Sequence, residues 1–184
     1  MTFWSNLLGY QVTWFVAVIG AGHAKSWPAC VATVLFCGVQ LAASSWRGLD
    51  VRLMALAGVL GVLVDGTLAS TGLLTYAPAK PATPLLGCPW WIFSLWLAFA
   101  TTLTRSFAWL RGRLGPAALI GAAGGPLAYE AAARGWGVIG FEAPLWRGVV
   151  ALALGWAIAL MILARTATPA MAGQPTAAEK VDFP

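Results

Sequence analysis

The chain has 184 residues, of which 60% are hydrophobic and only 9% are charged, and its mean hydropathy is +0.79. A soluble domain carries roughly a quarter charged residues, so the composition argues against a soluble globular protein. The net charge of +5 implies no nucleic-acid partner, because the basic residues form no cluster of the kind that nucleic acid requires.

Apolar segments near the length of a membrane-spanning helix, about 20 residues, follow one another along the chain. We expect six of them: 4–22, 28–45, 53–74, 89–110, 116–133 and 145–164. In a bilayer only helices satisfy their backbone groups within one segment. The sequence therefore predicts an all-α fold, a polytopic transmembrane bundle of six spans over residues 1–165. Residues 166–184, rich in Ala, Pro, Thr and Gln, are expected to form a disordered cytoplasmic tail.

The basic residues predict the orientation of this bundle. With the N-terminus in the cytoplasm, seven Lys and Arg lie on the inner side and four on the outer side, as the positive-inside rule favours. The inner ones are Arg47, Arg52, Arg105, Arg111, Arg113, Arg165 and Lys180, and the outer ones are Lys25, Lys80, Arg134 and Arg147. We therefore expect both termini inside.

Four of the six segments carry stripes of small or polar residues at helical spacing, which mediate helix contacts in membranes. In chain order these are Asn6, Tyr10, Thr13 and Ala17; Gly58, Gly61, Asp65, Ala69 and Gly72; Ser94, Ala98, Thr101 and Arg105; and the GxxxG pair Gly121 and Gly125. We expect segments one, three, four and five to face one another in a polar seam, and the second and sixth to face lipid. Pro126 predicts a kink or a local break, because proline cannot donate a backbone hydrogen bond.

Three ionisable residues lie inside the predicted spans: Asp65, Arg105 and Glu130. An unpaired charge at the bilayer centre costs roughly 2.5–3.5 kcal/mol on insertion scales. At a rise of about 1.5 Å per residue, both carboxylates lie on the order of 20 Å from the cytoplasmic side, and Arg105 roughly 8–10 Å from it.

Two interpretations of these charges compete. In the first, Arg105 pairs with Asp65, or binds backbone carbonyls near Pro126, and fixes the helix register. In the second, Asp65 and Glu130 share a polar cavity with Tyr129, Thr101 and Arg105, which together form the candidate substrate-binding site. Two neighbouring carboxylates share a proton and can act as general acid and base, or bind a cation or a polar headgroup.

Metal and cofactor chemistry finds no support in the sequence. His23 is the only histidine, and Cys30, Cys37 and Cys88 form no CxxC pair, so we expect no metal site and no cofactor. "GAAGGP" lacks the Lys-Ser/Thr of a nucleotide-binding loop. Two tryptophans deep in their segments, Trp96 and Trp156, are expected to be packing or cavity-wall residues.

Motifs along most of the chain resemble a family of small bacterial inner-membrane proteins that carries only a domain-of-unknown-function label. They are "NLLGYQVTWF", "GVLVDGTLASTGLLTY", "PWWIFSLWLAFATTLTRSFAWL" and "GAAGGPLAYEAAARGWG". The family pattern more often has histidine at the position of Arg105, which argues against a role that needs an imidazole there. The resemblance implies a multi-pass protein of the bacterial inner membrane. It also favours lipid metabolism, because relatives are encoded near lipid-modifying enzymes.

The leading hypothesis is an accessory protein that binds or moves a lipid or another amphiphile. An intramembrane lipid-modifying enzyme that uses buried carboxylates is one alternative, and a scaffold or assembly subunit of a membrane complex is another. The expected partners are membrane lipids and, for the last alternative, another membrane protein.

Overall fold

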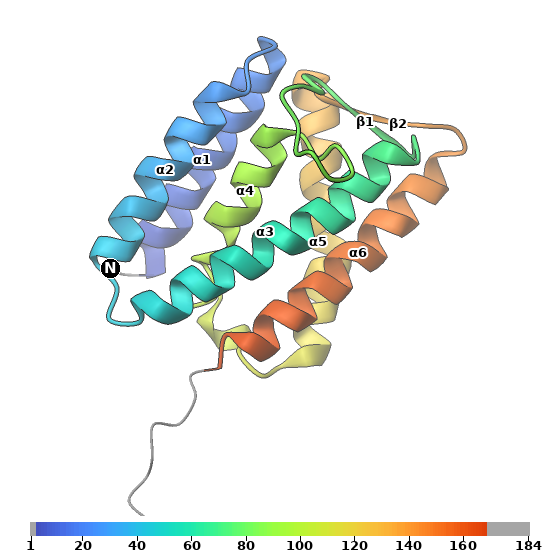
Figure 1. Cartoon of the computed structure of the whole chain (residues 1–184). Coiled ribbons are helices and arrows are strands. Elements are labelled where there is room, and N and C mark those ends of the chain that lie inside the picture. The colour runs from blue at the N-terminus through green and yellow to red at the C-terminus, as the bar shows by residue number, and fades with distance from the viewer. Residues whose placement is uncertain (1–2, 169–184) are drawn as a thin grey trace, which may run out of the picture.

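The structure, a computed structural model, describes residues 3–168 and is shown in Figure 1. Within these residues the chain folds into six α-helices, one short 3-10 helix and two short strands. They are α1 (Phe3–Gly22), α2 (Trp27–Ala42), α3 (Arg47–Ser70), β1 (Leu74–Tyr76), α4 (Trp90–Ala100), η1 (Ala108–Leu110), α5 (Leu114–Trp136), β2 (Ile139–Phe141) and α6 (Leu145–Thr166). The expected predominantly helical fold is confirmed, and the predicted tail from residue 169 onward lies outside the described residues.

The helices are arranged around the short helix α4 (Figure 1). α1 and α2 form an antiparallel pair on one side, and α3 and α6 run antiparallel to each other across the front of the view. α5 lies behind them and packs along α6. β1 and β2 pair antiparallel, with Tyr76 opposite Ile139, and this two-stranded ribbon covers one end of the bundle.

The fourth predicted segment is helical for only half of its length, because α4 ends at Ala100. Threonines follow directly, and their hydroxyls bond to backbone carbonyls three residues earlier: Thr101 to Ala98, Thr102 to Phe99 and Thr104 to Thr101. Such side-chain bonds compete with helical ones, and β-branching lowers helix propensity further. Thr101, Thr102 and Leu103 are fully buried, so this irregular backbone is enclosed by protein.

α5 and α6 approach closely along the predicted GxxxG pair. A Cβ added at Gly121 would lie 2.4 Å from the Trp156 carbonyl oxygen, and one at Gly125 would lie 2.5 Å from the Trp156 ring. Only glycine allows this approach. Pro126 lies inside α5, which continues without interruption to Trp136, so the predicted local break does not occur.

This close approach places α6 between α3 and α5. Leu152, Leu160 and Leu163 on its inner face are buried, whereas Leu154 and Ile158 on its outer face are exposed. The prediction that the sixth segment mainly faces lipid is therefore wrong, because the small residues of α5 admit it into the bundle.

Two helices, α3 and α6, are long and apolar enough to cross a membrane. Large apolar side chains are also exposed on α1 and α2, among them Leu8, Val12, Val34 and Leu35. The described part of the chain thus combines a packed interior with an unusually apolar exterior.

Candidate functional site

Asp65, in the second half of α3, is fully buried. Three side chains from other elements donate hydrogen bonds to its carboxylate. The hydroxyls of Tyr129 and Tyr76 lie 2.5 and 2.8 Å from Oδ1, and the indole N–H of Trp96 lies 2.7 Å from Oδ2. We call these four residues the Asp65 cluster. Among the described residues, no Lys or Arg forms an ion pair with Asp65.

Trp96 reaches Asp65 because α3 carries a glycine one turn earlier. A Cβ added at Gly61 would lie 2.4 Å from the Trp96 ring. Residues four apart lie on the same face of a helix, so the indole crosses Gly61 and aims its N–H at the carboxylate. The predicted glycine stripe of this helix therefore admits an aromatic ring from α4.

Tyr76 reaches the same carboxylate from the ribbon at the end of the bundle. Burial, and then the Asp65 carboxylate, raises the pKa of Tyr76 well above its usual value of 10. The hydroxyl therefore keeps its proton and remains a hydrogen-bond donor.

The Asp65 cluster satisfies a buried carboxyl group without a counter-ion. An indole N–H only donates, so Oδ2 acts as an acceptor, and two hydroxyls converge on Oδ1. A buried carboxylate without such partners is strongly destabilising. The cluster therefore ties α3, α4, α5 and β1 together at one point.

A cavity of about 190 Å³ lies beside this cluster. Its walls come mainly from α1, α4, α5 and α6, and they are rich in aromatic side chains: Tyr10, Trp14, Trp91, Trp96, Phe99, Phe107, Tyr129 and Trp156. Trp96 and Tyr129 belong both to this wall and to the Asp65 cluster. Trp96 stacks on Trp156 with ring centres 4.3 Å apart, so the predicted packing or cavity-wall role of these two tryptophans is confirmed.

The cavity shares part of its lining with a surface groove between α1 and α5. Tyr10, Trp14 and Ala128 line both the cavity and a surface groove that continues outward toward Phe15 and Trp136. The aromatic rings of Trp14 and Trp136 meet edge to face at 5.8 Å beside this groove. The cavity therefore borders the apolar outer surface, and Ile120 and Gly124 of its lining are themselves exposed.

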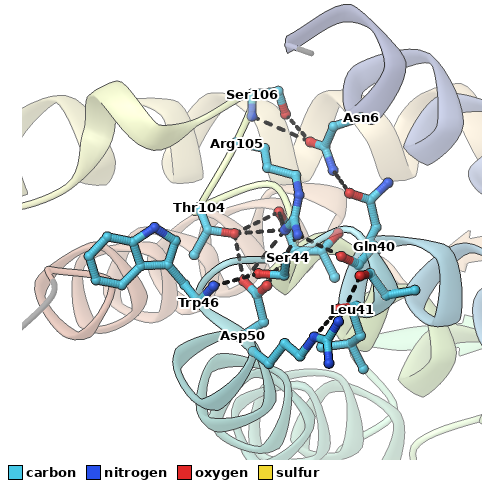
Figure 2. A network of polar contacts seen from close by, with 12 residues as sticks. Asn6, Gln40, Leu41, Ser44, Trp46, Asp50, Thr104, Arg105 and Ser106 are labelled. Carbon is cyan, nitrogen blue, oxygen red and sulfur yellow. Dashed lines mark hydrogen bonds and ion pairs between the residues drawn. The ribbon is translucent and has the colours of Figure 1, made fainter. Parts of the chain in front are cut away.

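A second polar cluster lies at the opposite end of the bundle, around Arg105 (Figure 2). Arg105 Nη2 lies 3.2 Å from the Asp50 carboxylate and 2.7 Å from the Gln40 carbonyl oxygen. The Thr104 hydroxyl donates to Asp50 at 2.6 Å. Asp50 is fully buried, and the Arg105 side chain is only 9% exposed.

Further hydrogen bonds extend this network to α1. Figure 2 shows the Ser106 hydroxyl donating to Asn6 Oδ1 at 2.6 Å and Asn6 Nδ2 donating to the Gln40 side chain at 3.1 Å. We call Asn6, Gln40, Asp50, Thr104, Arg105 and Ser106 the Arg105 cluster. It binds the irregular segment after α4 to α1, α2 and the start of α3.

Glu130 lies apart from both clusters. Its side chain is 40% exposed and pairs with Arg134, one turn later on the same helix. The three ionisable residues thus point to three separate places, and the prediction that they share one cavity is wrong. The alternative pairing of Arg105 with Asp65 is also wrong, because Asp50 lies nearer the same end of the bundle and takes the guanidinium.

The structure brings two of the five candidate residues together, Asp65 and Tyr129, through their hydrogen bond. Thr101 instead contacts Arg105, whose guanidinium donates to the Thr101 carbonyl oxygen at 3.2 Å. Whether any of the five binds a substrate stays a prediction. The sequence interpretation missed Asp50, which lies in "RGLDVR" at the start of a largely apolar helix. A carboxylate that is buried there needs a cationic partner, and an arginine inside another apolar segment was the available signal for the pair.

The fold and the site define a six-helix, predominantly apolar protein with a buried carboxylate cluster beside an aromatic cavity. The chain matches the model of the family "Protein of unknown function (DUF2878)" over residues 3–162 and belongs to that family. It has no significant match among curated proteins or among solved structures.

Proposed function

We propose that this chain is a multi-pass protein of the bacterial inner membrane that binds a lipid or another amphiphile in its aromatic cavity. In this proposal all six helices lie in the bilayer, with both termini in the cytoplasm. The protein acts as an accessory factor that holds or moves its ligand.

The distribution of apolar residues supports the membrane location. α1, α3, α5 and α6 have 20 to 24 residues, which matches the length needed to cross a bilayer. α4 is too short to cross alone, and the chain that follows it is irregular but buried at Thr101, Thr102 and Leu103. Non-helical backbone at membrane depth is tolerated where protein encloses it.

The observation that carries the ligand proposal is the cavity itself. An interior packed at normal density leaves few voids larger than a water molecule, and a cavity of about 190 Å³ far exceeds one water. Its exposed lining positions, Ile120 and Gly124, lie on the apolar helix α5. Such a space suits an apolar ligand that arrives from the bilayer.

The test measures lipid bound to the purified chain. In mild detergent, the wild type should retain about one lipid molecule per chain, the occupancy of a single preformed site. Gly124 lines the cavity at an exposed position where a Cβ meets no atom within 4 Å, so Gly124→Leu adds a side chain to the cavity lining and should remove that lipid. Gly38→Leu is the matched control, because Gly38 is likewise exposed with open space around it but lies on α2, which contributes no residue to the cavity lining. Equal lipid content in all three proteins would contradict the proposal.

A lipid-modifying enzyme is the second candidate, and one observation favours it. Tyr129 lines the cavity while its hydroxyl donates to Asp65, so a proton-transferring pair borders the ligand space. This version uses Asp65 and Tyr129 without Glu130 or Arg105. Tyr129→Phe should then leave the amount of bound lipid unchanged and remove a modified lipid species from the cells that express the protein.

The scaffold alternative expects a closed polar seam. Asp50 and Asp65 are both buried and engaged by donors, as that role expects, but Gln40 Nε2 in the Arg105 cluster is buried without a hydrogen-bond partner among the described residues, and the aromatic cavity has no part in a scaffold. Co-purification of a stoichiometric membrane partner with wild type and with Gly124→Leu alike would favour the scaffold.

A further inference from the structure

We infer that the cavity holds one acyl chain of a membrane lipid, and that this chain enters sideways from the bilayer between α1 and α5. The inference rests on the proposed function and adds to it the part of the lipid that is bound and the route that it takes.

The shape of the cavity fits a single chain. It follows α5 from Ile120 to Ala132, twelve residues, which correspond to about 18 Å along the helix axis. A volume of about 190 Å³ spread over that length describes a narrow tunnel. A narrow tunnel parallel to the helices accommodates an extended hydrocarbon chain better than a compact ring system.

The chemistry of the lining excludes a charged headgroup. None of the described residues that line the cavity is Lys, Arg or His, so a phosphate would find no cation there. The Asp65 carboxylate lies behind Trp96 and Tyr129, and its oxygens are already engaged by three donors. The headgroup therefore stays outside while the hydrocarbon occupies the tunnel.

The route follows from where the tunnel is open. Trp91 and Ile139 are buried at the end nearest the ribbon, which separates the tunnel from the loops there. The lining of the tunnel is instead exposed at Ile120 and Gly124. Between α1 and α5 the tunnel shares Tyr10, Trp14 and Ala128 with the groove, whose other lining residues include Phe15, Leu127 and Ala131, all three exposed. On a membrane-embedded chain this groove faces lipid tails, so an acyl chain reaches the tunnel without passing through water.

Two variants separate occupancy from entry. Gly124→Leu adds a side chain to the lining of the tunnel, whereas Ala131→Trp adds one to the groove, because Ala131 lines the groove but not the tunnel. Gly124→Val is a smaller replacement that serves if the leucine variant does not insert. Gly38→Leu on the exposed face of α2 is the control for an added leucine.

The full chain is reconstituted into phosphatidylglycerol and phosphatidylethanolamine vesicles with a trace of phosphatidylcholine that carries a diazirine midway along one acyl chain. After irradiation, mass spectrometry maps the label. In the wild type, the label should appear on buried tunnel residues such as Leu95 and Phe99, and also on exposed residues of α2 such as Val34. The α2 label reports insertion in every variant and serves as the internal reference.

Gly124→Leu and Ala131→Trp should each lower the tunnel label, relative to the α2 label, by about tenfold, which corresponds to 1.4 kcal/mol of binding free energy. Gly38→Leu should leave the ratio unchanged. If Gly124→Leu removes the tunnel label and Ala131→Trp does not, the entry route is overturned and the proposed function stands. If the wild-type tunnel is unlabelled while α2 is labelled, both the inference and the proposed function are overturned.

Discussion

Asp50 and Asp65 are two fully buried carboxylates on the same helix, yet they are held in different ways. Asp50 has a cationic partner, Arg105, and a hydroxyl from Thr104. Asp65 has three neutral donors and no ion pair among the described residues. Fifteen residues separate them, about 22 Å along α3.

The difference between them follows from what surrounds each carboxylate. The Arg105 cluster lies where the chain leaves α4 and loses regular helical hydrogen bonds, so the guanidinium bonds to free carbonyl oxygens as well as to Asp50. The Asp65 cluster lies beside a cavity, and two of its three donors, Trp96 and Tyr129, also form part of the cavity wall. The first cluster therefore braces the fold, and the second shapes a space.

The largest expected effect is the loss of Arg105. Arg105→Met leaves Asp50 buried without its cation and should lower the free energy of unfolding by about 3–5 kcal/mol, as for other broken buried ion pairs. The loss of unfolding free energy is measured by SDS titration with tryptophan fluorescence as the readout. The double variant Asp50→Leu with Arg105→Met should recover part of this stability, because it leaves no unpaired buried charge. If Arg105→Met alone lowers the free energy of unfolding by less than about 1 kcal/mol, the pair contributes no more than an exposed surface pair, which would contradict the prediction.

Asp65→Asn should have the next largest effect. The amide keeps one oxygen for the tyrosine hydroxyls but turns its NH₂ group toward the Trp96 N–H, which then lacks an acceptor. An unsatisfied buried donor costs about 1–3 kcal/mol. The same SDS titration reports the loss, and a fully retained stability would mean that Trp96 does not need the carboxylate.

Tyr76→Phe and Tyr129→Phe sharpen the comparison within the Asp65 cluster. Each removes one hydrogen bond to Asp65, so each should lower the free energy of unfolding by about 1–2 kcal/mol. Lipid binding should change the fluorescence of the cavity tryptophans. Because Tyr129 lines the cavity and Tyr76 does not, only Tyr129→Phe should alter the size of this lipid-induced change relative to the wild type. An equal lipid response in both variants would contradict the assignment of Tyr129 to the cavity wall.

Glu130→Ala should have the smallest effect. Its partner Arg134 is 81% exposed and lies one turn away, an arrangement typically worth about 0.3–0.5 kcal/mol. A change in unfolding free energy within this range is expected, and a change above about 2 kcal/mol would indicate an interaction beyond this exposed pair.

Hydrophobic pattern predicted the helices well and their long-range partners poorly. The pattern located four of the six helices, α1, α2, α5 and α6, to within a few residues. α3 begins six residues before its predicted segment, because its polar first residues still form helix, and α4 ends ten residues before the end of its segment. The glycine stripe of α3 correctly predicted the interior position of Asp65, but the GxxxG pair of α5, expected to face the polar seam, packs against α6 instead. Tyr76 was not predicted as a partner of Asp65, because the ribbon that carries it depends on pairing with residues more than sixty positions away.

The partner of Arg105 was also predicted wrongly, because the sequence pattern did not show where its helix ends. Its depth was estimated on a continuous helix through residue 110, but the threonines after Ala100 turn the chain. The guanidinium therefore lies beside the start of α3, at Asp50, rather than along the helix axis toward Asp65. A run of threonines inside an apolar segment was the available signal for this turn.

The most direct test of the two-cluster account is the lipid-induced shift in melting temperature. Purified wild type, Asp65→Asn and Asp50→Asn are each heated in detergent with and without dioleoyl phosphatidylglycerol, since a ligand that binds the folded state raises the melting temperature. The account predicts that Asp50→Asn melts earlier but keeps the wild-type shift, whereas Asp65→Asn loses it because Trp96 and Tyr129 no longer hold the cavity wall. A full shift in Asp65→Asn, or its loss in Asp50→Asn, would contradict the account.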